Sequence, residues 1–255
     1  MKSYIKFLYA CSFLLLLIIA FSSLVHLYEK RTKIKNFYGG FKKEKLSYNS
    51  KREDLYWANE ILNGGYILHF RHAERDKWID VKMYDALESD LHQNGQNGSR
   101  YAENDYFSKA VCLNDRGKIQ ARAMGESLDH IGLPIGMVIS SVSCRARQTA
   151  ELVFGGYEKM ERILVHKGTY YEDEQERVKK LIDLYQKFLI EKGKNVIVSS
   201  HDSVISCSMF VNDSCPKQLS LEEGGFYILS QTNKGLKFEH EFHNFNDFNK
   251  FFYKR

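Results

Sequence analysis

The strongest constraint on the fold is an alternation of short apolar segments with longer amphipathic segments from residue 52 onward. The apolar segments are rich in β-branched and aromatic residues, as buried strands are. The longer segments repeat apolar residues every three or four positions, which is typical of helices. Strands are predicted at 66–70, 136–141, 162–166, 195–200, 224–229 and 236–242, and helices at 52–63, 116–131, 144–154, 174–191 and 203–209.

Strands that alternate with helices indicate an α/β fold. The central strands are apolar along their whole length, which predicts a mainly parallel sheet covered by helices on both faces. In such folds the functional loops lie at the carboxyl ends of the strands. We therefore examined the residues that follow each predicted strand.

The strand at 66–70 is followed by Arg71, His72, Ala73, Glu74 and Arg75. Two arginines beside a histidine at the end of a buried strand repel one another unless an anion lies between them. Guanidinium groups suit phosphate oxygens, and a histidine can attack phosphorus or transfer a proton. This segment predicts a phosphate site with a nucleophilic histidine, although by itself it also fits a strand that ends in exposed charges.

Two further predicted strands are also followed by an arginine or a histidine that could bind an anion. Arg145 lies in the first turn of the helix that follows the strand at 136–141, and a helix N-terminus favours anions. His201 and Asp202 follow the strand at 195–200. Each residue alone is weak evidence, but three strand ends that deliver Arg71, His72, Arg75, Arg145 and His201 to one rim predict a single anion site.

The N-terminal region differs from the rest of the chain. An apolar segment from Phe7 to Leu27 follows Lys2 and Lys6, and it is long enough to cross a bilayer as a helix. A cleaved signal peptide is the alternative. We expect residues 1–28 to be a signal anchor or transmembrane helix, which places the large domain outside the cytoplasm, in the periplasm or an equivalent extracytoplasmic space.

Charge is unevenly distributed. The formal net charge is +5, of which residues 30–52 carry +8 and residues 1–29 carry +1, and this leaves −4 for residues 53–255. Nucleic-acid binding is therefore a poor interpretation of the basic composition. We expect residues 29–49 to be a basic linker that contacts the membrane, and residues 50–255 to form the folded domain.

Other features leave alternatives open. The segment 76–112 has little periodicity and is either a lid or substrate wall or a surface insertion. The five cysteines form no metal-binding pattern; Cys207 and Cys215 either pair in an oxidising compartment or are free, and Cys144 fills space beside Arg145. No chemistry is assigned to the remaining histidines singled out here, which are His69, His166, His240 and His243.

In order and spacing, four segments resemble the histidine phosphatase superfamily, whose fold is that of the phosphoglycerate mutases. They are Phe-Arg-His-Ala-Glu-Arg at 70–75, Leu-Asn-Asp-Arg-Gly-Lys-Ile-Gln-Ala at 113–121, Ser-Ser-Val-Ser-Cys-Arg-Ala-Arg-Gln-Thr-Ala at 140–150, and Val-Ile-Val-Ser-Ser-His-Asp at 196–202. The resemblance covers residues 52–242 and implies a three-layer sandwich. It implies that His72 is the nucleophile, that His201 donates to the phosphoryl group, and that Arg71, Arg75 and Arg145 bind its oxygens.

The resemblance also implies a general acid, and here two positions compete. In the smaller branch a glutamate in the loop after the third strand protonates the leaving oxygen, which favours Glu172 over its neighbours Asp173 and Glu174. In the acid phosphatase branch the aspartate after the second histidine does so, which is Asp202 here. The reaction implied needs no metal or other cofactor.

The function predicted is therefore a phosphomonoesterase that works through phosphohistidine on a small phosphorylated substrate such as a sugar phosphate. Arg75 and the apolar N-terminal segment resemble the bacterial periplasmic phosphatases of lipopolysaccharide core sugars. A mutase or a phosphohistidine protein phosphatase is an alternative, and a non-catalytic phosphate-binding module is another.

Overall fold

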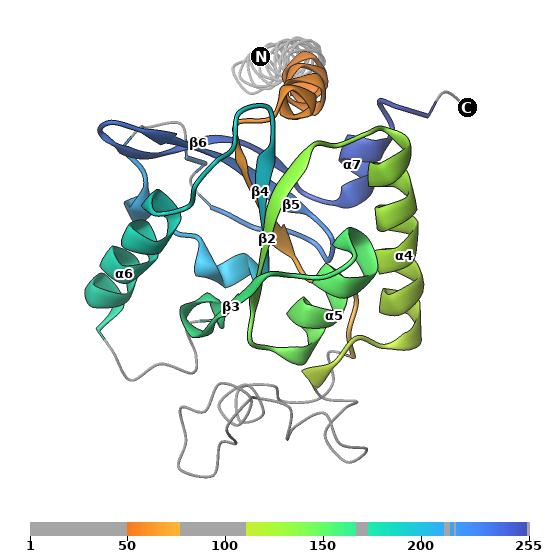
Figure 1. Cartoon of the computed structure of the whole chain (residues 1–255), viewed down its shortest axis with the longest axis horizontal. Helices are drawn as coiled ribbons and strands as arrows, with labels where there is room; N and C mark the ends of the chain where they lie inside the picture. Colours follow the sequence, from red (N-terminus) through yellow and green to blue (C-terminus); the bar gives the residue numbers. More distant parts are fainter. Residues whose placement is uncertain (1–49, 77–110, 167–172, 212–214, 217, 254–255) are drawn as a thin grey trace, which may run out of the picture. The chain divides into compact units, whose positions relative to one another are not determined.

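The computed structural model describes residues 50–76, 111–166, 173–211, 215–216 and 218–253. The chain divides into two compact units, Met1–Glu53 and Asp54–Arg255, and the second contains the sheet and the helices labelled in Figure 1. Among the described residues no helix has the length and apolar character needed to cross a membrane. The predicted membrane segment and linker, residues 1–49, lie outside the described residues.

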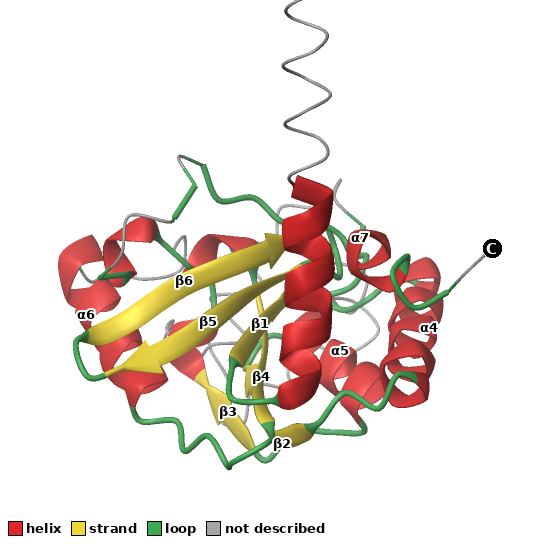
Figure 2. Cartoon of the chain, turned by 90° about the horizontal axis from the view of Figure 1, so that it is seen from above, coloured by secondary structure: helices red, strands yellow, loops and turns green. Residues whose placement is uncertain are grey.

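The second unit is built on a six-stranded mixed sheet. The strand order is β3-β2-β4-β1-β5-β6, which Figure 2 shows from above. The pairs β3–β2, β2–β4 and β4–β1 are parallel, whereas β5 pairs with β1 and β6 in antiparallel fashion. The strands are β1 (Ile67–Arg71), β2 (Ile135–Ser141), β3 (Lys159–Glu161), β4 (Asn195–Ser200), β5 (Phe226–Thr232) and β6 (Gly235–Phe242).

Helices cover both faces of this sheet, which confirms the predicted α/β architecture. In Figure 1, α4 (Asp115–His130), α5 (Cys144–Phe154) and α7 (Phe245–Asn249) lie on one side, and α6 (Glu174–Gln186) lies on the other. Side chains of β1 alternate between the two cores: Leu68 and Phe70 pack with the first group, and Ile67 packs with α6. Because both faces are buried, the strand is apolar at successive positions.

Helix α4 begins where the sequence predicts and for the expected reason. The Oδ1 atom of its N-cap, Asn114, accepts a hydrogen bond from Gly117 N at 2.7 Å. Helical spacing predicts a buried face of Ile119, Ala123, Met124 and Leu128. Met124 and Leu128 are buried as predicted, but Ile119 is 66% exposed and Ala123 is exposed, and Gly117 and Ala121 face the core instead. Small residues at the interface allow the start of α4 to approach the backbone that follows β1.

Two predicted elements are wrong. The strand expected at 162–166 lies earlier, at β3, and Arg162–Leu164 form a 3-10 turn that buries Leu164 completely. Leu164 packs into the core on the α6 side of the sheet, and the turn therefore does not continue the edge strand. The helix expected at 203–209 is two 3-10 turns, Asp202–Val204 and Cys207–Met209, because β-branched Val204 and Ile205 turn into the core.

Replacing Gly117 with alanine should destabilise the domain. Alanine is the better helix former by about 1 kcal/mol, but a Cβ atom on Gly117 would lie 1.9 Å from the Glu74 carbonyl oxygen, so the backbone beside the predicted site must move. Overpacking of this kind costs about 1–3 kcal/mol. Denaturant unfolding of Gly117→Ala should show a net loss, whereas the exposed control Arg122→Ala on the same helix should not. Equal or greater stability of Gly117→Ala would contradict this packing.

Candidate active site

The parallel pairing of β1 with β4 places two histidines side by side. Arg71 pairs with Ser200, and the backbone N–H of His72 donates to the carbonyl of Ser200 at 3.0 Å. His201 directly follows β4, so the ring centroids of His72 and His201 lie 5.3 Å apart at 70°. Strand β2 lies on the other side of β4 and leads to the N-terminus of α5, which carries Arg145.

His72 has the hydrogen bonding that a nucleophile needs. Its Nδ1 atom lies 2.7 Å from the carbonyl oxygen of Ala73, which can only accept, so Nδ1 carries the proton and Nε2 carries the lone pair. Burial lowers the pKa of His72 well below its usual value, and the nearby guanidinium of Arg145 lowers it further. The imidazole is therefore neutral at pH 7.

His201 is also neutral, but both of its ring nitrogens are engaged. The Nη2 atom of Arg145 lies 3.4 Å from Nδ1, and a guanidinium only donates, so Nδ1 accepts. Nε2 then donates toward the hydroxyls of Ser143 at 3.1 Å and Ser141 at 3.3 Å. Burial and the charge of Arg145 lower the pKa of His201 well below its usual value.

These residues share one cavity of about 190 Å³. All five residues that the sequence brings together from three strand ends line it, and so does Asp202, one of the candidate general acids. His166 and Ser203, to which the sequence assigned no role, complete the lining. The lining residues are Arg71, His72, Arg75, Arg145, His166, His201, Asp202 and Ser203. The cavity is small and cationic, as a site for one phosphoryl group would be.

The arginines reach the cavity from buried or anchored positions. Arg145 is only 1% exposed. Arg71 donates to the carbonyl of Leu221 and forms an ion pair with Glu223 at 3.3 Å. The loop that contains Leu221 and Glu223 therefore holds one side of the Arg71 guanidinium. Arg75 donates to the carbonyl of Asp76 at 2.7 Å. Anchoring fixes the cations before an anion binds, which reduces the reorganisation that binding requires.

Helix α5 is attached to the segment that carries His72. The Thr149 hydroxyl accepts from Ala73 N at 3.0 Å and donates to the Arg145 carbonyl at 2.8 Å. A disulfide joins Cys144, the first residue of α5, to Cys112. The space-filling role predicted for Cys144 is therefore wrong. Its partner lies 32 residues earlier in the chain, so no local pattern around Cys144 indicates the disulfide. The second disulfide, Cys207–Cys215, is the pairing weighed as one alternative.

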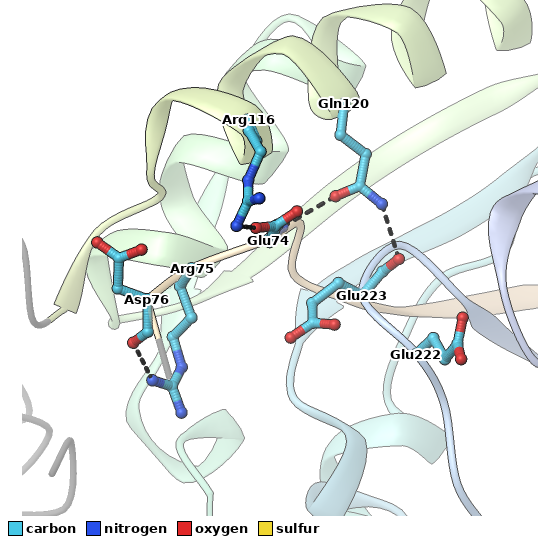
Figure 3. Close-up of a pocket in the computed structure, with 7 residues that line it drawn as sticks. All are labelled: Glu74, Arg75, Asp76, Arg116, Gln120, Glu222 and Glu223. Atoms are coloured by element: carbon cyan, nitrogen blue, oxygen red, sulfur yellow. Dashed lines mark hydrogen bonds and ion pairs between the residues drawn. The ribbon is translucent and has the colours of Figure 1, made fainter. Parts of the chain in front are cut away.

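A larger cavity of about 610 Å³ adjoins the first at Arg75, which lines both (Figure 3). Figure 3 shows Gln120 bridging its walls: Oε1 accepts from Glu74 N, and Nε2 donates to the carbonyl of Glu223, each at 2.9 Å. The wall contains more carboxylates than cations. Its residues are Glu74, Arg75, Asp76, Arg116, Gln120, Glu222 and Glu223.

Of the two candidate general acids, Asp202 lies at the cavity and Glu172 lies outside the described residues. Asp202 lines the cavity, and its Oδ1 atom accepts from Leu221 N at 2.8 Å and from the Tyr227 hydroxyl at 2.9 Å. Of the neighbouring acids, Asp173 is the N-cap of α6, accepting from Gln175 N, and Glu174 lies in the first turn of that helix.

His69 contacts the site through the backbone of His201. Its Nε2 atom donates to the carbonyl of His201 at 2.9 Å, and Nδ1 accepts from the Tyr185 hydroxyl at 2.6 Å. The side chain is fully buried, and burial lowers its pKa to about 4. His69 is thus structural, as expected, and it holds the backbone of His201.

His166 lines the cavity, although the sequence pattern assigned it no chemistry. The segment before it was interpreted as a strand, and a strand would have pointed alternate residues to opposite faces. A signal was present nonetheless, because His166 is the last residue of the strand predicted at 162–166, and His72 and His201 became candidates through their places at strand ends.

Comparison with known proteins agrees with the motifs. The family model of the histidine phosphatase superfamily (branch 1) matches residues 100–163, which include Arg145 but neither His72 nor His201. No curated protein matches the chain. The match confirms the resemblance to the histidine phosphatase superfamily, and it contains two of the four motifs whole, those at 113–121 and 140–150, of which the second carries Arg145.

Several solved structures are similar in fold. The protein histidine phosphatase SixA complexed with tungstate is 16% identical, with 69% of this chain and 95% of that chain covered and a TM-score of 0.46. A phosphoglycerate mutase from Bacillus anthracis is 14% identical, with 74% and 98% covered and a TM-score of 0.46. A mutant phosphoserine phosphatase from Entamoeba histolytica in complex with phosphoserine is 12% identical, with 74% and 99% covered and a TM-score of 0.43.

Acid should destabilise the domain through its buried neutral histidines. Because the pKa of His69 is about 4 in the folded state and about 6.5 when unfolded, its contribution is complete above pH 6.5 and is lost as the pH falls toward 4. At 1.36 kcal/mol per pH unit the full loss is about 3 kcal/mol, of which about 2 kcal/mol falls between pH 7 and pH 5. Denaturant unfolding at pH 7 and pH 5 should show the loss, and His69→Gln should reduce the difference. A pH-independent stability would contradict the burial of neutral His69.

Removing the disulfide between Cys112 and Cys144 should weaken both stability and anion binding. The bond spans 32 residues, for which the loss is roughly 2–4 kcal/mol. Because Cys144 adjoins Arg145, Cys112→Ser/Cys144→Ser should also bind tungstate more weakly in calorimetry. The pair Cys207→Ser/Cys215→Ser, which opens a loop of only eight residues, is the control for stability. Unchanged unfolding and tungstate affinity would contradict this role of the disulfide.

Proposed function

We propose that this protein is a metal-independent phosphomonoesterase that forms a phosphohistidine on His72. One observation carries the proposal: His72 is neutral, with Nδ1 bonded to the Ala73 carbonyl, in a cavity lined by three arginines. A lone pair on Nε2 is the requirement for attack on phosphorus. The arginines offset the negative charge that otherwise repels the nucleophile.

The reaction follows from this geometry in two displacements. His72 Nε2 attacks phosphorus and the bond to the leaving oxygen breaks, while Arg71, Arg75 and Arg145 bind the equatorial oxygens. Water then attacks the phosphohistidine, and His72 is restored. When the phosphoryl dianion lies beside it, His201 gains a partner that favours its charged form, so proton uptake by His201 adds the donor that the family resemblance implies.

The adjoining cavity supports a small polar leaving group. Arg75 belongs to both cavities, so an organic group attached to a phosphoryl bound at His72 has room to enter the larger one. Carboxylates such as Glu222 accept hydrogen bonds from hydroxyl groups. These features favour a sugar phosphate or another small phosphorylated molecule of the cell envelope as the substrate.

Location outside the cytoplasm is part of the proposal. Two disulfides, Cys112–Cys144 and Cys207–Cys215, favour an oxidising compartment. The apolar segment Phe7–Leu27 supplies an export signal or anchor, and the basic residues after it suit an anionic membrane surface. The chain would then act as a membrane-attached phosphatase of the periplasm.

The central test is phosphate release from an aryl phosphate, measured with a chelator present. We expect chelator-resistant release by the wild type, and a loss of at least about a thousandfold in His72→Ala because no nucleophile remains. The exposed residue His130 at the end of α4 provides the matched control, and His130→Gln should retain full activity. Rapid denaturation of the wild type in alkaline detergent should trap a labelled phosphoprotein that is stable in base and loses its label in acid, and His72→Ala should not form it.

Other outcomes separate the alternatives. Tungstate binding without turnover by the folded wild type would favour a phosphate-binding module and contradict the proposed enzyme. Transfer of the phosphoryl group between positions of a substrate without phosphate release would indicate a mutase. Release that is unchanged in His72→Ala would show that another residue is the nucleophile.

A further inference from the structure

His166 lies in the phosphoryl cavity without a role in the two displacements described above. It lines the same cavity as His72 and the three arginines, and its ring centroid lies 5.8 Å from that of His201. The residue is half-buried, and it belongs to the wall of the space that a phosphoryl group would occupy. A titratable group at this place can exchange a proton with the leaving oxygen.

The backbone before His166 is held at three successive carbonyls. The Nη2 atom of Arg177 donates to Val165 O at 2.8 Å and to Ile163 O at 3.4 Å. The Ser200 hydroxyl, at the end of β4, donates to Leu164 O at 2.7 Å. Leu164 and Val165 are themselves fully buried. These contacts from α6 and β4 fix the point at which the His166 side chain enters the cavity.

The other described groups of the cavity are committed to other partners. His72 must be unprotonated to attack, so it cannot donate the proton. The two nitrogens of His201 face Arg145 and the hydroxyls of Ser141 and Ser143. The Oδ1 atom of Asp202 accepts hydrogen bonds from Leu221 N and from the Tyr227 hydroxyl, which hold this carboxyl group against the loop at Leu221 and against β5. Arginine side chains do not release protons at working pH.

We propose that His166 is the general acid that protonates the leaving oxygen, and the general base for the second step. This inference rests on the phosphatase function proposed above. As His72 Nε2 forms its bond to phosphorus, the phosphorus–oxygen bond of the ester breaks and protonated His166 gives its proton to the departing oxygen, leaving as an alcohol. Neutral His166 then takes a proton from water as the water oxygen attacks phosphorus and the phosphorus–nitrogen bond breaks.

The test compares two leaving groups in the full domain with its disulfides formed. A p-nitrophenyl phosphate has a leaving group that departs without a proton, whereas a simple alkyl phosphate requires one. We expect His166→Gln to lower kcat/KM about 100-fold or more for the alkyl phosphate. For p-nitrophenyl phosphate the same variant should stay within tenfold of the wild type, because kcat/KM includes the steps only up to leaving-group departure. His130→Gln is the matched histidine control and should leave both values unchanged.

Carboxylate variants and a second His166 variant complete the test. An equal loss on both substrates in folded His166→Gln would show a structural or binding role, and no loss on either would show no role; both overturn the proposal. A selective loss for the alkyl phosphate in Asp202→Asn or Glu172→Gln, and not in His166→Gln, would assign the proton to that carboxyl group instead. His166→Asn is measured in parallel, with thermal unfolding of each variant, so that a misfolded variant is not taken as evidence.

Failure of the proposed function gives a different result. If the wild type releases no phosphate from either substrate, or if His72→Ala matches the wild type, the phosphohistidine route itself is wrong. The inference about His166 is then overturned with it. If both of those controls behave as expected and only the leaving-group dependence fails, the phosphatase function stands and the role of His166 does not.

Discussion

The site depends on one backbone contact, the hydrogen bond from His72 N to the carbonyl of Ser200. This bond continues the parallel ladder of β1 and β4 one residue past the last strand pair, so both histidines leave the sheet at the same level. A shift of one residue in the register would send one of the two rings to the opposite face. The burial of alternate residues of both strands in two separate cores therefore fixes the geometry of the cavity as well as the fold.

The balance of charge around the cavity follows from burial. Three guanidinium groups lie within reach of two imidazoles that stay neutral, because protonation would add further positive charge to a desolvated site. Neutral His72 and His201 are thus a consequence of burial first and of the arginine charge second. In the proposed reaction, a bound phosphoryl dianion would reverse this balance, because its negative charge would offset the arginines and favour a proton on a neighbouring histidine. Binding and readiness for proton transfer are coupled through the same electrostatics.

The sequence predicted the parts of the site that come from regular elements. Arg71, His72, Arg145 and His201 follow strands that are apolar and β-branched, and the rule that parallel strands end at one edge was enough to bring them together. Their chemical roles remain predictions.

The failures come from contacts that no local pattern encodes. His166 lies beyond a 3-10 turn fixed by Arg177 and Ser200, which are distant in sequence, and the pairing of Cys112 with Cys144 spans α4 and β2. The exposed position of Ile119 shows the same limit: helical spacing gives the period of α4, but Gly117 against Glu74 sets its rotation.

The short strand β3 has a consequence for how copies of this protein meet. It ends the sheet after three residues, and its two charged side chains, Lys159 and Glu161, bond to one another along the edge at 2.5 Å. At the opposite edge Lys237 and Glu239 of β6 form a similar pair, and Asp54 and Trp57, which lie in the helical segment 50–60, contact His240. Short, charged or covered edges disfavour the addition of a foreign strand. The protein is therefore built to resist edge-to-edge aggregation.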